Sequence, residues 1–436
     1  MNRKTCIVSI IILSTLITPL RASGQAGDPN DLRTLQDYLR YASLNNAALK
    51  SKFHQWKAEV EQIPQARALP DPRFTYGYFI EAVETRVGPQ RQRFEIMQTF
   101  PWFGVIEART DMAAAKAKAA YEKYQAQKLQ LFRDVKYTFY EYSYLAKAIE
   151  ITNENLELVK YFEQIIRQRY ATSINSHPDI IRAQIELAVL EDRLKSLQEL
   201  RPALTTKLNG ILNREAALEL PWPEPPEYQP VAIDFEQLYE IIIQNNPDLH
   251  VINYEIEAVR NSEKLAKKKS YPNVSLGVSY IDTAHARATG MPVNDSGKDP
   301  VIAMISLNLP IWTDSYSAAR RQAQAQRLQK TSEKIQMENS IASDSRQFLY
   351  DFEDSDRKIR LYSDVIIPKA EEMLTTSQTA YKAGTIDFLS LIDAQRTLLK
   401  YQLYYERLIS ENAQKLASLE MLAGTDLPEK TKNTEK

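Results

Sequence analysis

Hydrophobic and polar residues alternate in two stretches of the chain, 72–101 and 272–310. An alternation with a period of two, interrupted by a polar turn, predicts a β-hairpin in each stretch. Four strands are too few to close a barrel wide enough for a channel, so other subunits are expected to complete the sheet. Strands of about ten residues with aromatic ends suit a bilayer. The alternating residues of the two first strands are Phe74, Tyr76, Tyr78 and Ile80, and Val274, Leu276, Val278 and Tyr280.

Long helical patterns flank both predicted hairpins. Helices are expected from Leu32 to the first hairpin and over 105–170, 180–213, 313–383 and 387–423. The stretch 105–170 contains neither Pro nor Gly, which predicts a helix about 100 Å long at 1.5 Å per residue. A compact domain needs no helix of that length.

The helix expected over 105–170 carries two apolar stripes on nearly opposite sides. One passes through Val135 and Tyr142, and the other through Tyr137 and Tyr144. A helix with two opposed stripes is packed from both sides, as in the wall of a cylinder. The alternative, an ordinary long coiled coil, accounts for one stripe more simply than for two.

The chain reads as two diverged copies of one unit. The first unit covers 27–213, a Pro-rich connector covers 214–233, and the second unit covers 234–423, ahead of a tail at 424–436 that is expected to be disordered. Each unit reads helix, strand, strand, long helix, turn, helix. Asn45, Asn46, Leu49, Pro72 and Gly77 recur 200 residues later, Tyr170, Ala183 and Gln184 recur 211 residues later, and Pro101 corresponds to Pro310.

The first 26 residues are predicted to be a cleaved signal peptide. Arg3 and Lys4 precede an apolar run that ends in small residues, which is the usual order of such a segment. A membrane anchor is the less favoured alternative, because about 14 apolar-rich residues are too few to span a bilayer. Cys6, the only cysteine, lies ahead of the apolar run, so the mature chain is expected to lack disulfides and a lipid-bearing cysteine.

Composition and motifs do not indicate catalysis. The net charge of −1 argues against a nucleic-acid partner. The chain shows no phosphate loop and no nucleophile elbow, so we expect neither an enzyme nor a cofactor. The four histidines are scattered and have no cysteine near them, so no metal site is expected; they are His54, His177, His250 and His285.

Several motifs together resemble the TolC-like outer membrane factor family, the exit channels of bacterial efflux and type I secretion. They are the paired segments at 45–47 and 245–247, the prolines of QTFPWFG and LNLPIW, and the motif YKAGTIDFLSLIDAQRTL at 381–398. The loop VETRVGPQ with QTFPWFG is most similar to members that accompany heavy-metal cation pumps. The resemblance covers nearly the whole mature chain.

This resemblance implies an α+β membrane protein that forms a homotrimer. A long antiparallel α-helical barrel would continue a β-barrel shared by three subunits, with four strands per chain and two internal repeats. The chain would lie in outer membrane lipid with a large periplasmic part, and the connector would form a collar at the equator of the helical barrel. Its partners would be a periplasmic adaptor (membrane fusion) protein and an inner membrane efflux pump.

The resemblance also implies a periplasmic aperture at the helical tips, lined by carboxylates. Asp393 matches the family's aspartate, Ser390 stands where some relatives carry a second one, and Asp179 corresponds to Ser390 in the first unit. Asp387 also lies at this tip, and such a ring of charge would attract cations. Helix capping is the alternative role for Asp179 and Asp387. Turns of the repeats are expected at Gly384, Pro101 and Pro310.

The expected function is therefore a passive exit duct from periplasm to exterior, with heavy-metal cations as one possible cargo. The alternative is an exit duct for type I secretion or for drug efflux. A periplasmic coiled-coil scaffold without a channel is the alternative from another class of protein.

Overall fold

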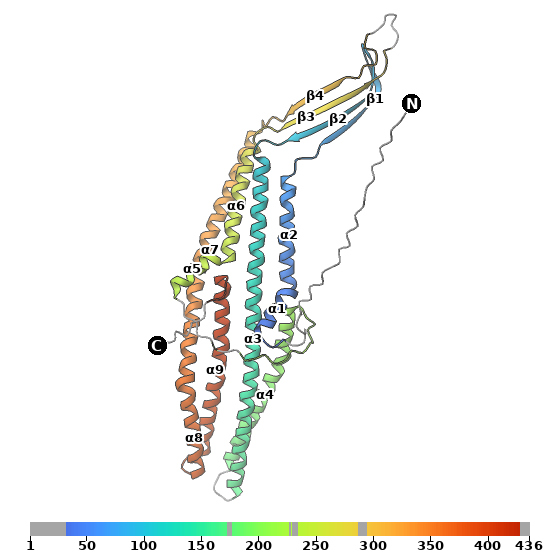
Figure 1. Cartoon of the computed structure of the whole chain (residues 1–436). Coiled ribbons are helices and arrows are strands. Elements are labelled where there is room, and N and C mark those ends of the chain that lie inside the picture. The colour runs from blue at the N-terminus through green and yellow to red at the C-terminus, as the bar shows by residue number, and fades with distance from the viewer. Residues whose placement is uncertain (1–31, 172–176, 226–227, 229–233, 287–293, 428–436) are drawn as a thin grey trace, which may run out of the picture.

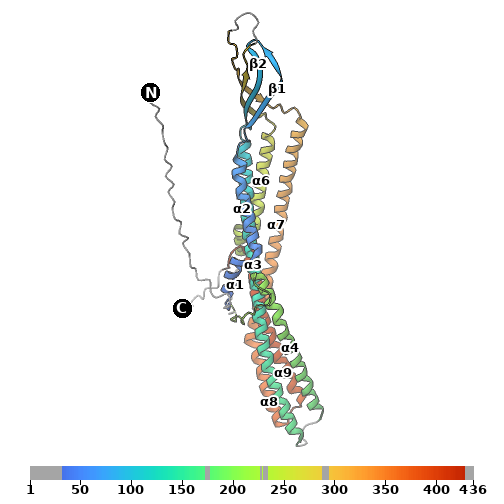
Figure 2. The same cartoon turned by 90° about the vertical axis from the view of Figure 1, so that its right-hand side faces the viewer.

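The computed structural model of the chain describes residues 32–171, 177–225, 228, 234–286 and 294–427. A four-stranded sheet lies at one end of an elongated molecule and two helical hairpins lie at the other (Figure 1). The helices between them run along the long axis (Figure 2). The expected signal peptide at 1–26 lies outside the described residues.

The elements follow the same order in each half of the chain. The first half contains α1 (Leu35–Asn45), α2 (Ala47–Arg67), β1 (Arg73–Thr85), β2 (Gly88–Phe100), α3 (Val105–Ala171) and α4 (His177–Leu212). The second half contains α5 (Phe235–Asn245), α6 (Pro247–Lys268), β3 (Val274–Thr283), β4 (Val301–Leu307), α7 (Thr313–Leu361), a π-helical segment η1 (Tyr362–Ile366), α8 (Ile367–Ala383) and α9 (Phe388–Ala423).

The helix expected from Leu32 to the first hairpin is interrupted at Asn46. Its backbone leaves the helical region, and its side-chain oxygen accepts a hydrogen bond from the Leu49 amide at 2.9 Å, so that it caps α2. An asparagine side chain is well suited to this position because it satisfies an amide that has no partner in the helix. Asn246 caps α6 in the same way, with 3.1 Å to the Leu249 amide.

The same two asparagines tie their helices to the end of the last helix of each half. The Asn46 side-chain amide donates to the carbonyl of Ile211 at 2.8 Å, and that of Asn246 donates to the carbonyl of Leu422 at 2.8 Å. Ile211 and Leu422 are themselves 211 residues apart. Each asparagine therefore joins the start of a helix that leads to the sheet (α2 or α6) to the end of a helix that comes from the tips (α4 or α9).

The sheet is antiparallel and has the strand order β1-β2-β3-β4. Its central pair, β2 and β3, joins the two halves of the chain, with Phe100 opposite Val274. β1 and β4 are the outer strands. Both edges therefore offer unpaired backbone groups, which is the usual condition for pairing with another chain.

The helical part is built around α3, which packs against α2 and α6 on the side of the sheet and against α4 and α9 on the side of the tips. The first apolar stripe is buried, with Val135 and Tyr142 fully enclosed, and the second is partly covered, with Tyr137 exposed. The buried side chains form separate clusters along the axis. Among the described helices, none is both long and apolar enough to cross a membrane.

Two local expectations needed correction. The helix expected over 313–383 contains the π-helical segment η1, which no pattern in the sequence indicated. The disordered tail expected from residue 424 begins instead with ordered residues. Gly424 ends α9 in the left-handed conformation, and Leu427 is buried in the cluster around α5, because its apolar side chain has a partner there. The remainder of the tail lies outside the described residues.

Candidate functional site

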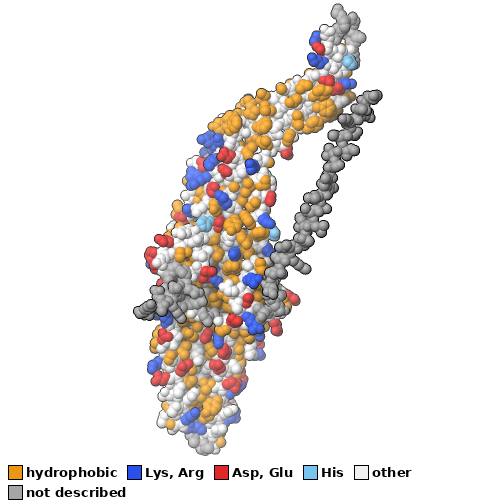
Figure 3. Space-filling model, in the orientation of Figure 1, with side chains coloured by type: hydrophobic (Ala, Val, Ile, Leu, Met, Phe, Trp, Pro, Cys, Tyr) orange, Lys and Arg blue, Asp and Glu red, His pale blue; other side chains and the backbone are white. Residues whose placement is uncertain are grey.

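One face of the sheet is strongly hydrophobic and exposed. The register places Tyr76 opposite Phe94, and Phe94 opposite Tyr280, so side chains from successive strands share this face. Ile80 at its far end is 92% exposed. Exposed apolar surface of this extent marks contact with a membrane or a partner. It appears as an orange band in Figure 3, and its exposed members include Phe74, Tyr78, Ile96, Leu276, Val278, Val301, Ile305 and Leu307.

The opposite face of the sheet is largely polar, with Ile302 as an exposed apolar residue on it. Arg93 forms an ion pair with Glu95 at 2.6 Å and donates to the Ser279 hydroxyl at 2.9 Å. Thr99 and Ser275 hydroxyls are 2.9 Å apart on neighbouring strands. A sheet with one apolar and one polar face can separate lipid from water.

Proline residues mark the change from sheet to helix. Pro101 directly follows β2, and Pro310 lies between β4 and α7. Aromatic side chains gather at the same level: Trp102 stacks on Tyr271 with ring centroids 5.3 Å apart, and Trp312 is 75% exposed. Tryptophan and tyrosine are favoured where a protein crosses from hydrocarbon to water.

At the other end of the molecule, Gly384 and Asp387 form the turn between α8 and α9. Gly384 has a φ of 76°, which a glycine adopts without steric cost. The Asp387 carboxylate caps α9, accepting hydrogen bonds from the Ser390 amide at 2.9 Å and the Ser390 hydroxyl at 2.7 Å. The Ser390 hydroxyl is the main cause that lowers the pKa of Asp387. The structure thus shows the capping role for Asp387.

The other aperture candidates are distributed over both helical tips. Asp179 lies within the first turn of α4, which begins at His177, and pairs with Arg182 at 3.3 Å. The Arg182 charge also helps to lower the pKa of Asp387, so the tips of α4 and α9 are electrostatically connected. Asp393 is exposed on α9, two turns from the cap.

Two contacts that the sequence analysis missed link the helical tips of the two halves. Arg169 of α3 donates to the backbone carbonyl of Tyr381 on α8 at 2.6 Å, and its guanidinium lies 5.0 Å from the Tyr381 ring. Arg396 of α9 binds the Glu186 carboxylate of α4 through Nε at 2.7 Å. Sequence spacing offered no signal for these pairs, because each joins residues about 210 positions apart.

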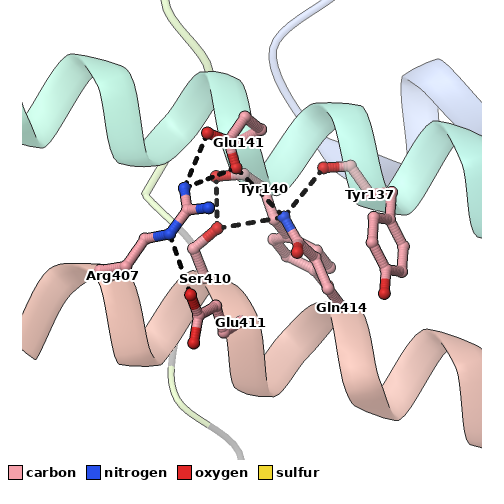
Figure 4. A network of polar contacts seen from close by, with 7 residues as sticks. All are labelled: Tyr137, Tyr140, Glu141, Arg407, Ser410, Glu411 and Gln414. Atoms are coloured by element: carbon pink, nitrogen blue, oxygen red, sulfur yellow. Dashed lines mark hydrogen bonds and ion pairs between the residues drawn. The ribbon is translucent and has the colours of Figure 1, made fainter.

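A network of polar contacts between α3 and α9, here called the polar seam, connects the two halves of the chain nearer the middle of the molecule (Figure 4). Arg407 Nη1 lies 2.7 Å from each carboxylate oxygen of Glu141, and its Nε lies 3.0 Å from Glu411. Directional contacts of this kind fix the register of two helices more firmly than apolar packing does. The seam also includes Ser410 Oγ donating to the Tyr140 carbonyl at 3.0 Å and Gln414 Nε2 donating to the Tyr137 carbonyl at 3.3 Å.

Within the described ranges, no group of three or more His, Cys, Asp or Glu side chains could hold a metal ion. Burial raises the pKa of Glu420 on α9, and Lys136 of α3 opposes that shift from 2.6 Å. This pair adds to the seam between the halves.

Comparison with known proteins identifies one family. The model of the outer membrane efflux protein family matches residues 39–210 and 238–425. The chain is 21% identical over 406 residues to the cobalt-zinc-cadmium resistance protein CzcC of Cupriavidus metallidurans, covering 90% of each chain. It is 22% identical over 386 residues to nodulation protein T of Rhizobium leguminosarum bv. trifolii, covering 83% of this chain and 79% of the relative.

Two other sequence matches are shorter, and a comparison with solved structures shows the fold. Two further relatives are matched over 43% and 39% of their own length, the second being toxin and drug export protein A of Aggregatibacter actinomycetemcomitans. Among solved structures, the outer membrane protein VceC from Vibrio cholerae superposes with a TM-score of 0.73 at 16% identity, covering 90% of this chain and 97% of that one.

Proposed function

Because this chain belongs to the outer membrane efflux protein family, whose model matches both halves of it, we propose that it is the exit duct of a tripartite efflux system. The protein lies in the outer membrane with a large periplasmic part. In this proposal an inner membrane pump and a periplasmic adaptor deliver the substrate and supply the energy. The duct itself carries out no catalysis.

The open sheet supports assembly into a trimer. β1 and β4 leave both edges unpaired, while one face is apolar and the other polar. In the proposed homotrimer, β4 of each subunit pairs with β1 of the next, and twelve strands from three chains close one barrel. The apolar face then meets lipid, and the polar face with Arg93 and Glu95 lines the lumen.

The parallel contacts of the two halves support the proposal that they are internal repeats, 27–213 and 234–423, separated by the connector at 214–233. Asn46 and Asn246 each cap one helix and bind the end of another at matching positions. Six similar helical pairs around a three-fold axis would make a nearly uniform cylinder. Such a cylinder continues the barrel into the periplasm as the proposed α-helical duct.

The helical tips are proposed to form the periplasmic aperture, with Asp393, Asp387, Asp179 and Ser390 near its rim. Arg169 with Tyr381, and Arg396 with Glu186, hold the tip of the first half against that of the second. The aperture widens only if these contacts between halves are broken or exchanged. The adaptor is proposed to act at these tips.

Heavy-metal cations are the proposed cargo. The support is the match to a cobalt-zinc-cadmium resistance protein over 90% of each chain, whereas the match to a toxin and drug export protein covers 41% of this chain. Deletion of the gene is expected to reduce growth on cobalt, zinc or cadmium salts more than on a panel of dyes. The reverse order would contradict the cargo assignment.

A cysteine cross-link tests the trimer directly. Thr75 of β1 and Ser306 of β4 both lie on the polar face near the helical end of the sheet, and Cys6 is the only natural cysteine. A Thr75→Cys, Ser306→Cys variant should form disulfides between subunits and migrate as a trimer after oxidation. The control pair Thr75→Cys, Ser279→Cys should not, because β3 is an interior strand. A monomer in both cases, soluble without detergent, would favour the scaffold alternative.

A further inference from the structure

A groove with a concentration of positive charge lies between α6 and α7, close to the sheet. It has a volume of about 660 Å³, and Glu263 is the only acidic residue that lines it. Figure 3 shows Lys and Arg side chains gathered at this end of the helices, directly below the hydrophobic band of the sheet. The basic residues are Arg260, Lys264 and Lys267 on α6, and Arg320, Arg321 and Arg327 on α7.

The positive charge of the groove is mostly uncompensated. Arg327 is paired with Glu263 at 3.0 Å. Within the part of the chain that the structure describes, the side chains of Arg260, Lys267 and Arg320 form neither an ion pair nor a hydrogen bond. Exposed like charges on two facing helices repel one another, and a bound anion would remove that repulsion.

The position of the groove indicates where such an anion comes from. Lys267 lies in the last turn of α6, and Arg320 lies two turns from the start of α7, about 10 Å along the helix. Trp312, three quarters exposed, lies in the chain between the apolar strand β4 and Arg320. If exposed aromatic rings lie at the membrane boundary, these cations lie at the depth of the lipid phosphates.

We propose that this groove binds the phosphate of an anionic phospholipid headgroup in the periplasmic leaflet of the outer membrane. The Arg320 guanidinium can bind two phosphate oxygens at once, and the Lys267 ammonium can neutralise the same charge. The inference rests on the proposed function, because that function places the sheet in the bilayer. The bound headgroup would fix the depth of the protein in the bilayer at the junction between strands and helices.

Lipid retention by the purified channel tests the proposal. The triple variant Arg260→Gln, Lys267→Gln, Arg320→Gln is compared with a matched control, Lys50→Gln, Lys195→Gln, Lys207→Gln, which removes the same charge from exposed sites far from the sheet. Each protein is equilibrated with phosphatidylglycerol and phosphatidylcholine, and bound lipid is counted by native mass spectrometry. Wild type and control should prefer phosphatidylglycerol by about tenfold, and the triple variant should lose most of this preference.

Each result that would overturn the proposal can be told apart from the others. Equal lipid preference in all three proteins overturns the proposal, as does displacement of phosphatidylglycerol by millimolar inorganic phosphate, which would indicate a soluble anion site. A changed ion selectivity of the triple variant, with unchanged lipid binding, would place the groove in the lumen and also overturn it. Stabilisation of the wild type by an acidic peptide but not by phosphatidylglycerol would overturn it in favour of a protein partner. Trimer migration is measured in parallel, so that loss of the trimer in wild type reports failure of the proposed function instead.

Discussion

Glu186 of α4 and Arg396 of α9 form an ion pair in which the Glu186 side chain is only 5% exposed while that of Arg396 remains half exposed. The pair joins the last helix of the first half to the last helix of the second, beside the proposed aperture. A carboxylate buried to this extent depends on its partner, because it has lost most of its hydration.

Removal of Arg396 should therefore loosen the helical tip. Arg396→Ala leaves Glu186 buried and unpaired, at a cost of about 1–3 kcal/mol. We expect a lower melting temperature and a larger single-channel conductance in planar bilayers. Lys369→Ala is the control, because Lys369 pairs with Glu372 on the same helix and both side chains are well exposed. A conductance that rises equally in both variants would contradict a specific role for the pair.

The asparagine caps give a second prediction. Asn246→Ala removes both the cap of α6 and the bond to Leu422, which should cost about 1–2 kcal/mol and lower the melting temperature by several degrees. Asn46→Ala should have a similar effect in the first half. Asn245→Ala serves as the control, because its side chain bonds only within α5 and should change stability by less than either.

Asp393 is expected to contribute to ion passage. In the proposed trimer, three Asp393 carboxylates would surround a narrow pore and attract cations, so Asp393→Ala should weaken block by divalent cations and reduce cation selectivity in bilayer recordings. Glu215→Ala removes an exposed charge from the connector and should leave both properties unchanged. If the two variants behave alike, Asp393 does not line the aperture.

The Asp387 cap predicts a dependence on pH. Hydrogen bonding by Ser390 lowers the pKa of Asp387 below its ordinary value of 3.8. A lowered pKa in the fold means that the ionised cap stabilises α9 above pH 3.8, and that this contribution is lost as the pH falls through the lower, folded value.

Amide exchange measures this effect. After correction for the intrinsic rate, exchange of the Ser390 amide should accelerate as the pH falls below about 4. In Asp387→Asn, which cannot ionise, protection should show no such transition. Equal pH profiles for the two proteins would mean that ionisation of Asp387 does not stabilise the start of α9.

Much of the architecture follows from local pattern. Alternating hydrophobic residues such as Tyr76 and Tyr78 share one face only when the segment is a β-strand. A stretch of 66 residues without Pro or Gly favours one uninterrupted helix. The turn at Gly384 and the helix cap at Asp387 could also be predicted from the sequence, since each depends on backbone groups within four residues.

The sequence by itself determined the strands, the long helices and the turn chemistry, because these depend on neighbours along the chain. Only the tertiary structure decided that Arg396 meets Glu186, that Arg169 meets Tyr381, that η1 interrupts the helix after Leu361, and that the cations of α6 and α7 face one groove. Those contacts join residues between about 50 and 210 positions apart, or depend on how a helix fits its neighbours, so no local period encodes them.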